Sequence, residues 1–179
     1  MKVLKFGGTS VGSSTNISKV IKIIKEESAS ENIVVVVSAV GGITDKLLLA
    51  ADKAIDKDLS YKEDFEALRQ KHIEVIDGLL SGEVHEATTD IVLEHLSRLE
   101  KLLDGVYLIN ELSPKTTDKL LSFGELISSL IIYEAIKAKG VNVQLKNSQN
   151  LIVTDSNFTN AAVNFEETNA NITTYFENN

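Results

Sequence analysis

Five consecutive β-branched residues, Ile33–Val37, constrain the fold of this chain more than any other feature of its sequence. A run of this kind without polar alternation is typical of a parallel strand that is buried on both faces. A second strand is predicted over Lys2–Phe6, and residues 16–27 between the two carry apolar side chains at helical spacing (Ile17, Val20, Ile21 and Ile24). Strand, helix and strand in this order predict a βαβ unit with a right-handed crossover.

The rest of the chain is predicted to be mainly helical. A helix through residues 47–51 is expected to be capped by Thr44 or Asp45, and residues 62–104 are expected to form two more helices that separate near Ser81-Gly82. The remaining predicted elements are a helix from Ser113-Pro114 to Gly140, strands over residues 141–145 and 151–153, and a helix over residues 164–177. Together they predict an α/β fold with a mostly parallel sheet and a helical segment at about 62–104.

Composition narrows the classes of function. The chain has 179 residues, a net charge of -8 and no cysteine, which excludes disulfides and thiolate metal ligands and fits a reducing compartment. The negative charge argues against nucleic acid or an anionic membrane as a partner. No apolar run approaches the roughly 20 residues that span a bilayer, and the N-terminus lacks the pattern of a signal peptide. We therefore expect a soluble, cytoplasmic protein.

Two glycine-containing loops are the candidate functional segments. Residues 7–10 (GGTS) and 38–42 (SAVGG) each follow a predicted parallel strand and precede a helix, and ligands of open α/β sheets bind outside those strand ends. Glycine lets backbone N–H groups approach an anion closely, and the following helix N-termini favour negative charge. Lys5 is the penultimate residue of the predicted strand Lys2–Phe6, where its ammonium could neutralise a phosphoryl group in transfer. The other interpretation is two ordinary turns between a strand and a helix.

Several well-known site signatures are absent from the sequence. It contains no G-x-x-x-x-G-K-[ST] loop, no G-x-G-x-x-G fingerprint and no G-x-S-x-G elbow. The three histidines, His72, His85 and His95, lie on predicted helices without a ligand partner four residues on. We expect them to be structural or solvated, and we predict no metal site in this chain.

Four motifs together resemble the aspartate kinases of the amino acid kinase superfamily. They are KFGGTSV at residues 5–11, SAVGGITD at 38–45, SFGE at 122–125, and VTD at 153–155 followed by Phe158 and Ala161. Their order and spacing match the family over the whole chain, and residues 94–105 look more like the bifunctional aspartokinase–homoserine dehydrogenases. The resemblance implies a three-layer amino acid kinase-like fold, present here only in part.

The resemblance also implies an activity and a set of site residues. Aspartate kinases use ATP and Mg²⁺ to phosphorylate the β-carboxylate of L-aspartate to 4-phospho-L-aspartate, the first step toward lysine, threonine and methionine. By resemblance, Lys5 is the catalytic residue and stabilises the phosphoryl group in flight. The other implied contacts are Gly7, Gly8, Thr9 and Ser10 for the ATP phosphates, and Ser38, Ala39, Thr44 and Glu125 for aspartate. The full-length protein is expected to be a homo-oligomer.

Other interpretations remain open for individual residues and for the chain. Thr44 could simply cap a helix and Glu125 could simply face solvent, although its apolar neighbours Phe123 and Ile127 favour a partnered carboxylate. The chain could also be another amino acid kinase, acting on glutamate, carbamate or a nucleotide, or a binding module without catalysis.

The sequence departs from the family in one respect. The family's nucleotide-side half, with its glycine-arginine-glycine-glycine-serine-aspartate stretch, is missing, and so are the regulatory domains. The chain's two arginines, Arg69 and Arg98, lie away from the glycine loops, whereas a carboxylate clamp needs an arginine beside them. We expect residues 1–179 to be the N-terminal, substrate-side part of a kinase domain, inactive alone.

Overall fold

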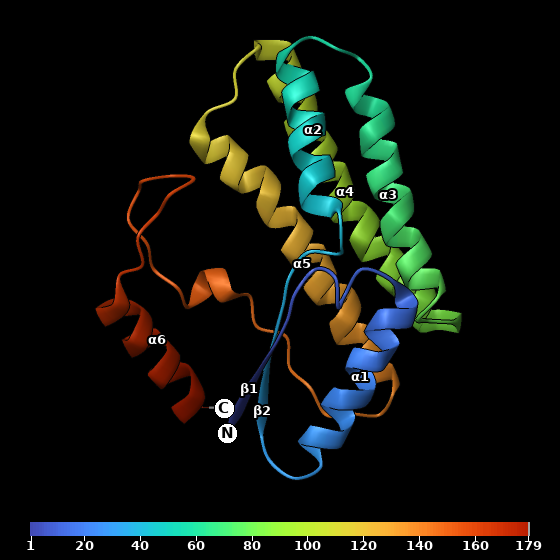
Figure 1. The fold of residues 1–179 in the computed structure, drawn as a ribbon, viewed down its shortest axis with the longest axis vertical. Coiled ribbons are helices and arrows are strands. Elements are labelled where there is room, and N and C mark those ends of the chain that lie inside the picture. Colours follow the sequence, from blue (N-terminus) through green and yellow to red (C-terminus); the bar gives the residue numbers. More distant parts are fainter. Residues whose placement is uncertain (179) are drawn as a thin grey trace.

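The predicted βαβ unit opens the structure, a computed structural model that describes residues 1–178 (Figure 1). Strand β1 (Lys2–Phe6) pairs in parallel with β2 (Ile33–Val37), and the register runs from Lys2 opposite Ile33 to Phe6 opposite Val37. Helix α1 (Ser14–Ser28) makes the crossover, and the Ser13 hydroxyl caps it by accepting a hydrogen bond from the backbone N–H of Asn16 at 3.2 Å. Both strands and the helix are confirmed.

Four helices form a bundle beyond the carboxyl ends of the two strands (Figure 1). The predicted break near Ser81-Gly82 is confirmed, although the helix that follows it extends past residue 104, and Pro114 opens the fourth helix as predicted. The apolar stripe of Leu96, Leu99 and Leu103 is buried in the core. The four helices are α2 (Ile43–Ile55), α3 (Tyr61–Asp77), α4 (Gly82–Ile109) and α5 (Pro114–Ala138). No helix within residues 1–178 is long and apolar enough to cross a membrane.

The C-terminal segment contains less regular structure than predicted. It holds a 3₁₀ turn, η1 (Ser148–Asn150), and a helix, α6 (Phe165–Glu177), which confirms the last predicted helix. The predicted strands at 141–145 and 151–153 are wrong: over residues 1–178 neither joins a ladder, and only a Thr154–Val163 bridge forms nearby. Val141 and Val143 pack half-buried against the core, so their alternation reflects burial rather than strand pairing.

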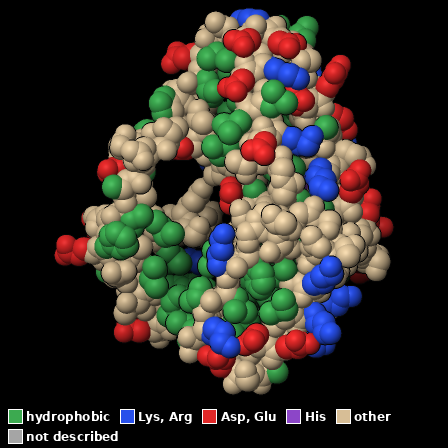
Figure 2. Space-filling view, viewed as in Figure 1, with side chains coloured by type: hydrophobic (Ala, Val, Ile, Leu, Met, Phe, Trp, Pro, Cys, Tyr) green, Lys and Arg blue, Asp and Glu red, His purple; other side chains and the backbone are tan. Residues whose placement is uncertain are grey.

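The sheet is less covered than the β-branched run predicts. Val36 in β2 is 46% exposed and Val3 in β1 is 63% exposed, so burial of β2 on both faces is wrong for the described residues. Helices α1 and α5 contact β2, and no further strand flanks the pair within residues 1–178. Hydrophobic side chains accordingly gather on the surface over the two strands and α6 (Figure 2). The α/β class with a parallel sheet is confirmed.

Two of the three histidines have hydrogen-bond partners within the fold. His72 in α3 is buried, and its Nδ1 donates a hydrogen bond to the carbonyl oxygen of Leu68 at 2.9 Å. His85 lies 2.7 Å from a carboxylate oxygen of Asp77. Burial lowers the pKa of His72 to about 4, because the charged imidazolium would lose its hydration.

This burial predicts a loss of stability in acid. In the unfolded chain His72 binds a proton below about pH 6.5, whereas in the folded chain it binds one only below about pH 4. Its contribution to the free energy of unfolding is therefore complete above pH 6.5 and decreases as the pH falls from 6.5 to 4. We expect the free energy of unfolding to drop by about 3 kcal/mol across this window on account of His72. Urea unfolding of the chain and of His72→Leu at several pH values measures the difference.

The control is His85→Gln, which changes the partly exposed histidine and should leave the pH dependence in place. An unchanged pH dependence in His72→Leu would contradict the assignment.

Candidate functional site

The two glycine loops meet through their backbones. A β-carbon added at Gly41 would lie 2.9 Å from the carbonyl oxygen of Gly8 and 3.1 Å from the Cα of Gly12. Real β-carbons do not approach backbone this closely, so glycine at position 41 permits the contact. The loops run side by side between the strands and the helical bundle, next to the middle of α5 (Figure 1). Both therefore lie at the same edge of the sheet.

Buried side chains and backbone hydrogen bonds hold the loops in place. Val11 in the first loop and Ala39 and Val40 in the second are almost completely buried. The N–H of Ser38 donates to the carbonyl oxygen of Phe6 at 3.1 Å, which extends the β-ladder into the second loop. The loops are thus fixed extensions of the sheet rather than free turns.

The first loop has an additional support that the sequence did not reveal. The Asn16 side-chain amide donates to the carbonyl oxygen of Thr9 at 3.1 Å, and the N–H groups of Ser10 and Val11 both donate to the carbonyl oxygen of Gly7. The sequence could have predicted this hydrogen bond, because an asparagine in the first turn of a helix after a glycine loop can bond through its amide to the nearby backbone.

Lys5 lies over the first loop. A β-carbon on Gly7 would lie 3.3 Å from the Lys5 Nζ, so the side chain bends back toward the glycines and its ammonium stays exposed. Within residues 1–178, the N–H groups of Gly7, Gly8 and Thr9 donate to no intramolecular acceptor. An accessible cation beside free N–H groups can bind an anion, and both loops lead into helix N-termini that favour negative charge.

The SFGE segment joins this site through Gly124 of α5. A β-carbon at Gly124 would lie 3.0 Å from the Cβ of Ala39 and 3.4 Å from the Cγ2 of Ile43, so α5 packs directly on the second loop. Glu125 is the next residue, and it is exposed and forms no ion pair within residues 1–178. The expectation that its apolar neighbours leave the carboxylate in need of a partner is wrong, because those neighbours point into the core and Glu125 points outward.

Thr44 occupies the first turn of α2 but does not cap the helix. The N-cap is Gly42, whose φ of 81° lies in the left-handed region that favours glycine, and no side-chain cap bond forms there. Both predicted caps, Thr44 and Asp45, are therefore wrong. The Thr44 hydroxyl is exposed and makes no hydrogen bond within the described residues.

The two arginines lie elsewhere, as expected. Arg69 in α3 pairs with Glu66 at 2.9 Å, and Arg98 lies on α4. The geometry accordingly brings together one lysine, two glycine loops, the start of α2 and the middle of α5. Thr9 and Ser10 are exposed in the first loop, and Ser38 is half-buried in the second loop.

Curated relatives of the chain are aspartokinases. The chain is 32% identical over 165 residues to aspartokinase 1, chloroplastic, of Arabidopsis thaliana. This alignment covers 90% of the chain and 28% of the relative. It is 27% identical to the bifunctional aspartokinase/homoserine dehydrogenase of Buchnera aphidicola, over 96% of this chain and 21% of the relative. The chain thus spans less than a third of the length of these relatives.

Solved structures of aspartokinases have the same fold. E. coli aspartokinase III in complex with aspartate and ADP superposes with a TM-score of 0.88 at 24% identity, over 98% of this chain and 37% of that chain. Its complex with lysine and aspartate gives a TM-score of 0.86. The sequence matches the amino acid kinase family over residues 1–179, and the chain therefore belongs to that family.

Proposed function

We propose that this chain is the N-terminal, substrate-side part of an aspartate kinase, which uses ATP to convert L-aspartate to 4-phospho-L-aspartate. The observation that carries the proposal is the contact of Gly41 with Gly8, with the Lys5 ammonium beside Gly7. The names of the relatives, and the aspartate and ADP bound in the E. coli structure, support this choice of substrate and nucleotide.

On this proposal the first loop handles the phosphates. The free N–H groups of Gly7, Gly8 and Thr9, with the Ser10 hydroxyl, donate to phosphate oxygens of ATP. Lys5 places its ammonium next to the transferred phosphoryl group and offsets the charge that its oxygens carry. Catalysis by positioning and charge requires a rigid cradle, which the buried loop residues provide.

The second loop and α5 hold aspartate. Ser38 and Ala39 of the second loop contact the substrate, and the Thr44 hydroxyl, which makes no hydrogen bond within the described residues, can donate to substrate oxygens. The exposed Glu125 carboxylate can accept hydrogen bonds from the substrate ammonium. Gly124 brings that part of α5 against the loop.

The wider setting is part of the same proposal. The nucleotide-side half and any regulatory domains lie outside residues 1–179, and the full-length protein acts as a homo-oligomer in the cytoplasm, in lysine, threonine and methionine biosynthesis. Among the residues that the structure describes, no group of three or more His, Cys, Asp or Glu side chains could hold a metal ion, and we assign no Mg²⁺ ligand to them.

Substrate choice is tested by titrating the ¹⁵N-labelled chain with a panel of candidate substrates. We expect L-aspartate to shift the amide resonances of Ser38, Ala39, Thr44 and Glu125, and L-glutamate, carbamate and UMP to shift them less. Glu125→Gln should weaken aspartate binding by about tenfold, because the charged partner of the ammonium is lost. Glu111→Gln, at another exposed glutamate without an ion pair, is the control. A stronger response to another ligand of the panel would identify a different amino acid kinase.

The chain alone should not complete the reaction. Incubated with ATP, Mg²⁺, L-aspartate and hydroxylamine, it should form no aspartyl hydroxamate above a protein-free sample, because neither arginine lies in the glycine loops to clamp the α-carboxylate. E. coli aspartokinase III serves as the positive control. Turnover by residues 1–179 would show that they contain a complete site.

A further inference from the structure

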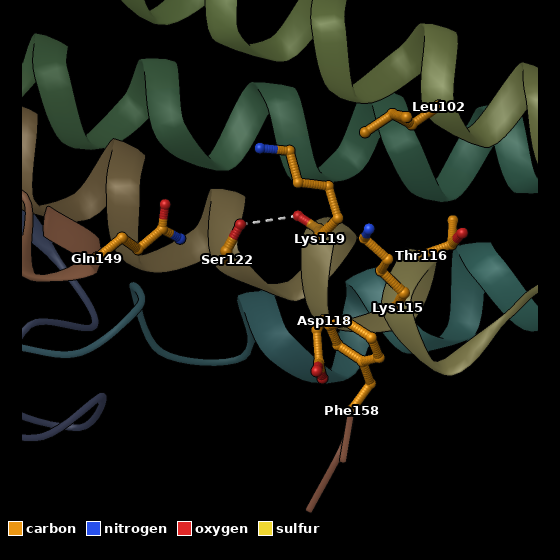
Figure 3. Close-up of a pocket in the computed structure, with 8 residues that line it drawn as sticks. All are labelled: Leu102, Lys115, Thr116, Asp118, Lys119, Ser122, Gln149 and Phe158. Carbon is orange, nitrogen blue, oxygen red and sulfur yellow. Dashed lines mark hydrogen bonds between the residues drawn. The ribbon is translucent and has the colours of Figure 1, made fainter. Parts of the chain in front are cut away.

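A second concave site lies away from the glycine loops. A pocket of about 580 Å³ opens between α4, the first half of α5, η1 and the loop before α6 (Figure 3). Figure 2 shows this side of the molecule hollowed between α5 and the C-terminal segment. None of the pocket residues is among those assigned to ATP or aspartate, although Ser122 opens the SFGE segment and Phe158 belongs to the fourth family motif. The pocket thus needs its own explanation.

The pocket concentrates positive charge in an acidic chain. Lys115 and Lys119 lie one turn apart on α5, and neither forms an ion pair within residues 1–178, although the net charge of the chain is -8. Like charges at this helical spacing repel each other, and a bound anion would relieve the repulsion. The Lys119 ammonium lies on the side of the Phe123 ring, 5.8 Å from its centroid. The acidic residue of the pocket, Asp118, already accepts a hydrogen bond from the N–H of Thr159 at 2.9 Å.

The wall opposite α5 is a preformed loop. Asp155 closes it: its backbone N–H donates to the carbonyl oxygen of Ala162 at 3.0 Å, and its carboxylate accepts hydrogen bonds from the N–H groups of Asn157 and Ala162. Thr159 at the tip has a φ of 67°, a conformation that β-branched residues rarely adopt. Such strain persists only where surrounding contacts enforce it, and here the Asp118 hydrogen bond does so.

The same loop supplies an aromatic surface beside the cations. The Lys115 Nζ lies 5.6 Å from the ring centroid of Phe158, and Leu102 of α4 adds apolar lining. Thr116 and Gln149 contribute a hydroxyl and an amide that can donate hydrogen bonds. Cations, neutral donors and apolar walls therefore line one pocket, a combination typical of sites for small organic ligands.

We propose that this pocket binds a small organic anion. Its carboxylate or phosphoryl oxygens lie between the ammonium groups of Lys115 and Lys119, and its apolar part packs against Phe158 and Leu102. The inference does not depend on the kinase proposal, because no residue assigned there to ATP or aspartate lines the pocket.

Titration of the ¹⁵N-labelled chain with four probes tests the proposal. Benzoate and phenyl phosphate combine an apolar ring with a carboxylate or a phosphoryl group, inorganic phosphate lacks the ring, and benzyl alcohol lacks the charge. At least one of the first two should shift the amide resonances of Lys115, Lys119, Phe158 and Thr159, with an affinity about tenfold above those of benzyl alcohol and inorganic phosphate. The stronger of the two identifies the anionic group.

Variants separate the pocket from non-specific attraction. Lys115→Gln with Lys119→Gln should weaken binding by about tenfold or more, whereas Lys25→Gln, at an exposed lysine of α1, should not. Phe158→Ala provides a second test, because it removes the aromatic wall without changing the charge. Absence of shifts at the pocket, shifts at the glycine loops instead, or equal binding by all variants would overturn the proposal.

Discussion

Backbone contact between Gly41 and its neighbours Gly8 and Gly12 is the constraint on which the candidate site depends. Two parallel strands bring their carboxyl ends to one edge, but this alone leaves the following loops free to diverge. The missing β-carbon at Gly41 lets the loops touch, and the buried Val11, Ala39 and Val40 keep them there. Lys5, at the end of β1, then has a fixed cradle beside its ammonium.

The same contact links the strands to the helical bundle. Gly124 of α5 packs against Ala39 of the second loop, and α2 begins directly after that loop. A change in the position of α5 must therefore move the loop, or open a gap between closely packed backbones. Such coupling places the middle of α5, through Gly124, against the loop that follows β2.

Much of this arrangement could be predicted from the sequence, where local patterns decide structure. The β-branched run of β2, the apolar stripe of α1 and the proline at the start of α5 each specify an element through short-range chemistry. Predictions that depended on a contact with another part of the chain were less accurate. Residues 141–145 alternate like a strand, but within the described chain no neighbouring strand pairs with them. The N-cap of α2 is Gly42, in the left-handed conformation, and not Thr44. The charged pocket could not be predicted from the sequence, because Asp118 and Thr159 lie far apart in the chain and come together only on folding.

The most direct test of the account is whether a phosphate chain binds the first glycine loop and whether that binding depends on the loop's contact with Gly41. Tripolyphosphate added to the ¹⁵N-labelled chain should shift the amides of Gly7, Gly8 and Thr9. Gly41→Ala should weaken binding by about tenfold, because its methyl group would force the loops apart. Gly105→Ala, where the added carbon meets nothing within 4 Å, should bind like the unchanged chain. Shifts confined to Lys115 and Lys119, or equal binding by both variants, would contradict a phosphate cradle at the glycine loops.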